Sequence, residues 1–382
     1  MSIIYTPEQI QIRDLVRRVA AERVAPRANE IDATAEYPQD MFLLLKELGL
    51  FSLPFPEEYG GMGSMVTACL AIEELGRVCY NTAYLLLVQW VPFVAILASG
   101  SEEQRRRYLP GLSTGDVRGA LALTEPQSGS DVAGIKTKAE RRGDSYVITG
   151  SKSWCTNAGL ADFILVAAKT GDSGSRGNIG LFLMETDRAG FELGRKEDKM
   201  GARGVPSWQL HFDDVELPLS SRIGGAETGF KVVMEALNHS RPIIGARGVG
   251  LAQGALDHSI NFVKDRHAFG KSVADFQGVR WMLADMAIQI EASRHLVYAA
   301  AAAVDRGVRG NDLAQMAAVA KCHATDTAMR VATDAVQLFG ASGISNEFPI
   351  NRYFRDAKVL QIIEGTNQIQ RNIISRNLLS DR

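Results

Sequence analysis

The chain has 382 residues, of which 46% are hydrophobic and 23% are charged, and its formal net charge at pH 7 is −2. A chain of this length buries a large core without disulfides, which excludes disordered, collagen-like and cysteine-framework classes. The near-neutral charge argues against nucleic acid or an anionic membrane as the main partner.

Residues 1–117 are expected to form an α-helical domain. Thr6 and Gln9 are spaced as a capping box, in which a hydroxyl and an amide side chain bind the first free backbone groups of a helix. Ser101 and Gln104 repeat this spacing at the start of a later helix. Apolar residues then recur with helical period in the segments that follow.

One uncharged stretch, residues 78–101, must be weighed as a membrane span, which needs ~20 apolar residues. Polar residues and Pro92 interrupt it, so a buried core helix is favoured and no membrane span is expected. The first residues contain neither a basic nor an apolar signal region. With arginine in excess over lysine, this indicates a cytoplasmic protein of a bacterium.

Residues 118–226 change to short alternating or β-branched segments between turn signals, among them 145–149, 163–166 and 208–212. Such closely spaced strands predict a small all-β domain rather than βαβ units. A flexible loop is expected at 171–177.

The helical period returns in residues 227–382. Long helices are expected at about 230–263, 276–306 and 312–338, with a shorter one from about residue 366. Four such helices indicate a bundle. The predicted order of domains is therefore α, β, α.

Familiar nucleotide and metal motifs are incomplete. Gly270-Lys271-Ser272 resembles the end of a phosphate-binding loop, but the glycine required five residues earlier is Asp265. The six histidines and four cysteines show no zinc-ligand spacing, so no metal is expected.

Several polar segments are candidates for chemistry. The turn at 121–131 carries hydroxyls and backbone amides suited to a polar ring or a phosphate, and Trp154 lies beside another turn. The alternative for the turn is an ordinary loop, and a tryptophan such as Trp154 is more often a core residue than a cofactor contact. Glu364 lies between an apolar run and a glycine. A desolvated carboxylate there has a raised pKa and is a stronger base.

In their order and spacing these motifs resemble the acyl-CoA dehydrogenase family, over essentially the whole chain. The resemblance is carried by T-E-P-x-x-G-S-D from Thr124, R-x-x-F-G from Arg266 with a later F-Q, and I-x-E-G-T-x-x-I-Q from Ile362. It implies an α-helical N-terminal domain, a β-barrel-like middle domain and a C-terminal four-helix bundle. It also implies FAD, a homotetramer built as a dimer of dimers, and an electron-transfer flavoprotein as the electron acceptor.

The reaction implied is oxidation of an acyl-CoA to the trans-2-enoyl-CoA, with Glu364 removing the α-proton while the β-hydride passes to flavin N5. The resemblance assigns cofactor contacts to Leu121, Leu123, Thr124, Ser130, Trp154, Thr156, Arg266, Phe276, Gln277, Gln337, Leu338, Gly340, Ala341, Thr366 and Gln368. Some of these would reach the FAD of a neighbouring subunit. It assigns substrate contacts to Ser130, Asn238, Arg241, Gly365 and Arg376.

The chain departs from the family pattern at several positions. Ser240 stands where part of the family carries its base, so the base is assigned to Glu364. Asn238 stands where medium-chain relatives carry an acid. Ala341 replaces the second glycine of Q-x-F-G-G, which adds a methyl group near the expected pyrophosphate. Gln127-Ser128 replaces the usual Gly-Ala pair.

Other functions on this fold remain open. They are a dehydrogenase of carrier-protein thioesters, an oxidase that uses oxygen, a flavin monooxygenase and a helical scaffold without flavin. Glu364 disfavours the monooxygenase, which needs no α-proton base. Trp90 predicts short, branched or cyclic acyl groups if its indole lines the acyl pocket, but not if it lies in the helical core.

Overall fold

The computed structural model describes residues 5–171, 178–225 and 229–379, so the loop expected at 171–177 lies almost wholly outside the described residues. The N-terminal domain is helical, as predicted. Its helices are α1 (Pro7–Val19), α2 (Ala28–Thr34), α3 (Gln39–Glu47), α4 (Met65–Gly76), α5 (Tyr80–Ser99) and α6 (Glu102–Thr114). A π-helical turn (Ala20–Val24) and 3₁₀ turns (Ala25–Arg27, Leu50–Ser52, Glu57–Tyr59) connect them.

Local side-chain chemistry starts two of these helices. Thr6 accepts from the backbone N–H of Gln9, and the Gln9 side chain returns a bond to Thr6, which confirms the first capping box. Ser101 and Gln104 form the second in the same way. Helix α5 is the one described helix long and apolar enough to cross a membrane, but most of it is buried inside the protein, as expected of a core helix.

Trp90 belongs to this helical core. Its ring is fully buried, and its Nε1 donates to the carbonyl of Phe51 at 2.7 Å. Of the two positions considered for Trp90, the acyl pocket and the helical core, the structure shows the helical core. The indole therefore gives no reason to expect a short acyl group.

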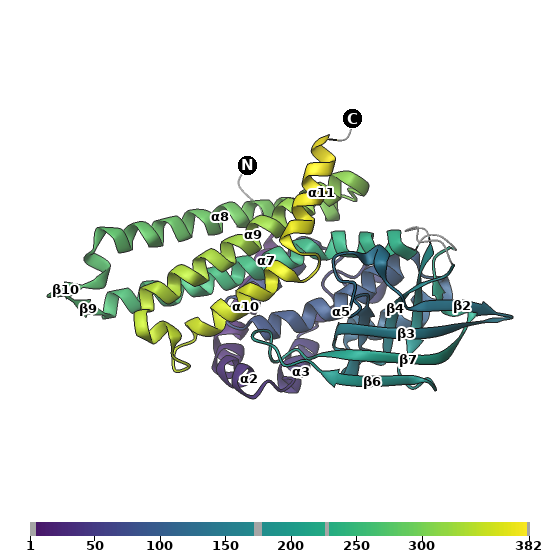
Figure 1. Cartoon of the computed structure of the whole chain (residues 1–382). Helices are drawn as coiled ribbons and strands as arrows, with labels where there is room; N and C mark the ends of the chain where they lie inside the picture. The colour runs from purple at the N-terminus through teal and green to yellow at the C-terminus, as the bar shows by residue number, and fades with distance from the viewer. Residues whose placement is uncertain (1–4, 172–177, 226–228, 380–382) are drawn as a thin grey trace.

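The middle domain is a β-sheet, as predicted, and Figure 1 shows it at one end of the molecule. The strand order is β6-β7-β3-β2-β4-β5-β8, and β1 adds in parallel to β4. The strands are β1 (Gly119–Ala122), β2 (Lys138–Arg142), β3 (Ser145–Thr156), β4 (Phe163–Lys169), β5 (Ile179–Glu185), β6 (Phe191–Lys196), β7 (Ser207–Pro218) and β8 (Arg222–Ile223). Short 3₁₀ turns lie at Val132–Gly134, Ala158–Leu160 and Leu219–Ser221.

The C-terminal domain is the predicted helical bundle. It comprises α7 (Gly229–Asp265), α8 (Gln277–Asp305), α9 (Gly310–Phe339), α10 (Ile350–Ile362) and α11 (Asn367–Leu379), with the hairpin β9 (His267–Ala268) and β10 (Lys271–Ser272) and 3₁₀ turns at Val273–Asp275 and Gly340–Ile344. Helix α7 packs against α8 and α9 and also against α4 and α5. One apolar core therefore joins both helical domains, while part of the sheet has a core of its own.

Helix α10 was not predicted, because its charged residues obscure the apolar period. Lys358 is exposed, but the other charged residues of α10 face neighbouring domains. Arg355 pairs with Asp32, Arg352 donates to Asn29 and to the carbonyl of Val78, and Asp356 accepts from the backbone of the β6–β7 connection. The polar face of α10 is thus an internal interface with the other domains, which holds the turn that follows it in place.

Candidate active site

The turn between α10 and α11 places Glu364. Glu364 and Gly365 both have left-handed backbone conformations, with φ of +56° and +86°. The φ of +86° favours glycine at position 365, and a Cβ there would also displace the end of the Gln370 side chain, whose Nε2 would lie 2.8 Å away. Thr366 then accepts from the backbone N–H of Ile369 at 3.3 Å and starts α11. The apolar end of α10 is thereby followed at once by a carboxylate that turns back toward α7.

The Glu364 carboxylate meets the middle of α7. Ser240 donates its hydroxyl to Oε2 of Glu364 at 2.9 Å. Burial raises the pKa of Glu364, although the Ser240 hydrogen bond and the nearby charges of Arg241, Arg247 and Lys321 lower it in part. The residue keeps some accessible surface. It is therefore a carboxylate with a raised pKa that can still be reached.

Lys321 holds the backbone of this turn from α9. Its buried Nζ donates to the carbonyl of Gly365 at 2.9 Å and to Oδ1 of Asn367 at 2.8 Å. Burial, together with the charge of Arg241, lowers the pKa of Lys321 to about 7. Sequence reasoning missed this residue, since a single lysine in an alanine-rich helix gives no signal of a buried partner.

The substrate contacts implied by sequence divide into two groups. Asn238, Arg241 and Gly365 lie around Glu364, where Asn238 accepts a hydrogen bond from the buried guanidinium of Arg241. Burial lowers the pKa of Arg241 to about 10. Ser130 is exposed in the β1–β2 connection, and Arg376 is exposed on α11. These last two do not belong to the buried group.

The predicted flavin segments at 121–130 and 154–156 are tied together by a buried ion pair. Lys152 on β3 donates to Glu125 at 2.7 Å and to the carbonyl of Leu123 at 3.1 Å, and both charged groups are almost fully buried. The backbone N–H of Ser153 donates to the carbonyl of Thr124 at 2.8 Å. The loop after β1 is therefore fixed against the end of β3. The sequence places Glu125 in the motif that begins at Thr124, but it gave no sign that Glu125 pairs with Lys152.

A register shift between β3 and β7 directs Trp154 outward. The shift lies between Lys152 and Cys155, and Trp154 has a φ of +58°. Its indole is 55% exposed, and the Thr156 hydroxyl beside it lies 3.1 Å from that of Ser207. An exposed aromatic face with adjacent hydroxyls and backbone groups fits a planar heteroaromatic ring such as isoalloxazine.

Seven further predicted cofactor residues lie at the end of the molecule opposite the sheet. Arg266, Phe276 and Gln277 flank the β9–β10 hairpin, which Figure 1 shows farthest from the sheet. The segment Gln337, Leu338, Gly340 and Ala341 is at the same end, because Phe262 of α7 stacks on Phe339 of α9 at 4.1 Å. Ala341 is exposed, so its methyl group crowds nothing within the chain. A single chain does not bring these residues to Trp154.

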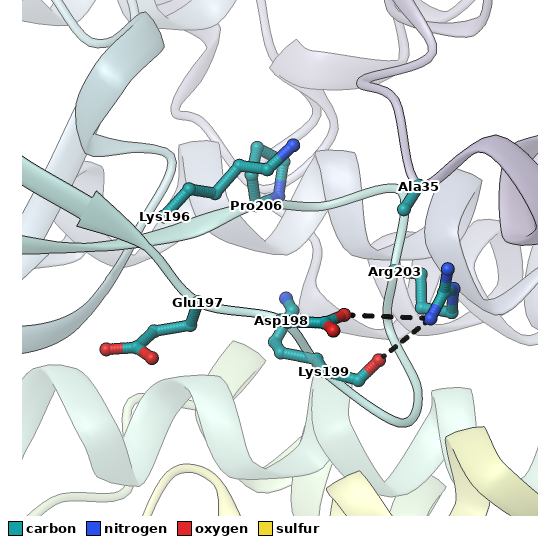
Figure 2. A pocket seen from close by; sticks show the side chains of 7 residues that line it. All are labelled: Ala35, Lys196, Glu197, Asp198, Lys199, Arg203 and Pro206. Carbon is teal, nitrogen blue, oxygen red and sulfur yellow. Dashed lines mark hydrogen bonds and ion pairs between the residues drawn. The ribbon is translucent and has the colours of Figure 1, made fainter.

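The remaining two predicted cofactor residues flank the first turn of α11, where Gln368 is exposed and Thr366 is partly buried. Figure 2 shows the residues that line a separate surface pocket, which are Ala35, Lys196, Glu197, Asp198, Lys199, Arg203 and Pro206. The volume of this pocket is about 160 Å³. Arg203 lies across it, 3.8 Å from Asp198 and 3.4 Å from the carbonyl of Lys199. None of the predicted site residues lines this pocket, and it is smaller than ordinary ligand sites. Within the described ranges no group of His, Cys, Asp or Glu side chains could hold a metal ion.

Known proteins and family models match this chain over nearly its whole length. Models of the acyl-CoA dehydrogenase N-terminal, middle and C-terminal domains match residues 6–116, 120–215 and 227–379. The probable acyl-CoA dehydrogenase fadE25 of Mycobacterium leprae is 42% identical over 97% of this chain and 95% of its own. Two solved structures each have a TM-score of 0.95 with full coverage of both chains. One is described as the electron transferring flavoprotein of Acidaminococcus fermentans, at 39% identity, and the other is butyryl-CoA dehydrogenase of Megasphaera elsdenii, at 36%.

Proposed function

Because the chain belongs to the acyl-CoA dehydrogenase family of oxidoreductases, we propose that it oxidises the Cα–Cβ bond of an acyl-CoA thioester, with Glu364 as the base. The observation that carries this proposal is the Glu364 carboxylate, which burial makes more basic and which a left-handed turn and Ser240 hold in one position. An α-proton of a thioester is weakly acidic, so the acceptor must be both basic and fixed.

The chain's own residues account for the proton transfer. Oε2 of Glu364 is bound by Ser240, which leaves Oε1 to accept the α-proton. Arg241 and Lys321 bring positive charge to the turn and favour the ionised carboxylate before the reaction. The backbone N–H of Glu364 is the donor assigned to the thioester carbonyl, where negative charge develops in the transition state.

FAD, when bound, supplies the redox chemistry by accepting the β-hydride. Leu121, Leu123, Thr124, Trp154 and Thr156 would hold its ring at the edge of the sheet. The residues around the β9–β10 hairpin and the end of α9 would hold the FAD of a neighbouring subunit, in a homotetramer arranged as a dimer of dimers. An electron-transfer flavoprotein is the proposed electron acceptor, in keeping with the solved relative of that description. The proposed location is the cytoplasm of a bacterium.

The experiment is anaerobic mixing of the purified FAD-bound protein with a panel of acyl-CoAs, read by bleaching of the flavin. We expect bleaching by at least one thioester and formation of the trans-2-enoyl product. Reoxidation is then compared between an electron-transfer flavoprotein and oxygen, which separates a dehydrogenase from an oxidase. A fully flavinated protein that no CoA thioester reduces, or that only carrier-protein thioesters reduce, contradicts the proposal.

A further inference from the structure

Arg247 is a buried cation without a hydrogen-bond partner. It lies on α7, two turns beyond Ser240, and is 0% exposed. Within the described part of the chain, Nε, Nη1 and Nη2 all lack a partner. Arg352, which is also buried, differs because it donates to Asn29 and to the carbonyl of Val78. A guanidinium stays charged at any physiological pH, so a buried one is stable only when an acceptor satisfies it.

Two tyrosines of α5 enclose the guanidinium. Its Cζ lies 4.3 Å from the ring centroid of Tyr80 and 4.0 Å from that of Tyr84. The ring faces attract the positive charge, but they cannot accept the N–H groups, which point outward in the guanidinium plane. Burial raises the pKa of Tyr84, and its hydroxyl is near enough to Arg247 for the guanidinium to lower that pKa in part. The buried hydroxyl of Tyr80 also lacks a partner among the described residues.

The guanidinium belongs to the surroundings of Glu364. Arg247 acts on the pKa of Glu364 together with Arg241 and Lys321, so the cations around this carboxylate outnumber it. Lys199 is also near Arg247, but the carboxylate of Asp356 acts on Lys199 more strongly than Arg247 does. Glu364 feels the charge of Arg247 but accepts no hydrogen bond from it within the described residues. Three cations therefore act on one carboxylate here, and within the described residues the Arg247 nitrogens have no acceptor.

We propose that Arg247 is a specificity-determining residue that binds a carboxylate at the far end of the acyl group, so that the substrate is the CoA thioester of a dicarboxylic acid. This inference rests on the proposed function. The planar fork of a guanidinium matches the two oxygens of a carboxylate, and the tyrosine faces fix its plane. Glu364 then acts at the α-carbon while Arg247 holds the opposite end. A neutral acyl chain leaves the buried N–H groups unpaired and is disfavoured.

The test uses matched pairs of thioesters that differ only in the terminal carboxylate: succinyl- with butyryl-CoA, glutaryl- with valeryl-CoA, and adipyl- with hexanoyl-CoA. For the FAD-bound wild-type protein we expect kcat/KM for the anionic member of the best pair to exceed that for its partner by about 100-fold or more. Equilibrium binding of the same pair to FAD-bound Glu364→Gln, which cannot turn over, should show the same preference.

Arg247→Met should lower this anionic-to-neutral ratio by about 30-fold or more, and Arg247→Lys should lower it less. The matched control is Arg142→Met, which makes the same change in net charge at an exposed ion pair on β2 and should leave the ratio unchanged. A wild-type preference for the neutral member of every pair, or a ratio unaffected by Arg247→Met, overturns the inference while leaving the proposed function standing. If no thioester bleaches the flavin, the proposed function itself fails.

Discussion

Glu364 combines burial with an unusual backbone conformation. A non-glycine residue with positive φ costs of order 1–3 kcal/mol and persists only where its surroundings impose that conformation. Here the surroundings do so, because Lys321 and Gln370 donate to the carbonyl of Gly365 at 2.9 Å each. The strain thus has a function, which is to direct the carboxylate toward Ser240.

Ser240→Ala should shift the pH dependence of the reaction. The pKa of Glu364 is raised, so the rate of flavin reduction falls as pH decreases through that pKa and the base becomes protonated. The Ser240 hydrogen bond favours the ionised form, and its loss raises the pKa further. We expect the acid limb of the single-turnover rate to move to higher pH. Ser259→Ala is the control, since that buried serine of α7 donates only to the carbonyl of Ala255; an equal shift in both variants would contradict the assignment.

At the scale of elements, the loop after β1 depends on a buried charge pair. Burial alone would raise the pKa of Glu125, but the charge of Lys152 and hydrogen bonds from Thr137 and Lys136 lower it to about 2. Burial lowers the pKa of Lys152 to about 8, so the pair also weakens as the pH rises through that value. The folded-state pKa of Glu125 lies below the usual 4.5, so the carboxylate's contribution to stability is complete above that pH. It is lost as the pH falls from about 4.5 toward 2.

Lys152→Met should leave the Glu125 carboxylate buried and unpaired, at a cost of about 3–5 kcal/mol. Because the same pair fixes Leu123 and Thr124 against β3, FAD should dissociate at a lower temperature than in the wild type. Thermal denaturation with flavin release as a second signal measures both effects. Adding Glu125→Gln should restore part of the stability, and Lys138→Met, at an exposed position of β2, should have little effect. Unchanged melting of Lys152→Met would rule out the anchoring role.

An element could be predicted from the sequence when the interactions that form it join residues close together in the chain. The capping boxes at Thr6 and Ser101 are local and were read correctly from spacing. Helix α10 was missed because its charges pair with another domain. Lys152 and Lys321 were missed because their hydrogen-bond partners lie far away in the sequence. Arg247 was missed because the two tyrosines that enclose it belong to another helix. The role of Glu364 came from family resemblance, while its hydrogen bond with Ser240 needed the structure.

The whole molecule leaves apolar side chains uncovered on one part of the bundle. Phe269 of the β9–β10 hairpin is 92% exposed, and Trp281 and Ile288 of α8 are each 61% exposed. Burial of such side chains is ordinarily gained at a subunit interface. They lie on the hairpin and helix that also carry Arg266 and Gln277, so assembly and cofactor binding are expected to be coupled.

Arg266→Ala should therefore lower FAD occupancy and weaken the oligomer together. Sedimentation across a range of protein concentrations, with flavin absorbance recorded in each species, measures both. Arg306→Ala is the control, because that exposed arginine follows the other end of α8. A monomer that retains stoichiometric FAD would show that one chain holds the cofactor alone.

The central claim, that Glu364 is the base, is tested most directly by Glu364→Gln. The substitution keeps the shape of the side chain and removes its basicity. We expect flavin reduction by the best acyl-CoA to slow by at least ~10³-fold, while FAD content and reduction by dithionite stay unchanged. Ser240→Glu in this background should recover part of the rate, because the Ser240 hydroxyl lies 2.9 Å from Oε2 of Glu364. Flavin bleaching by substrate at near the wild-type rate in Glu364→Gln alone would contradict the claim.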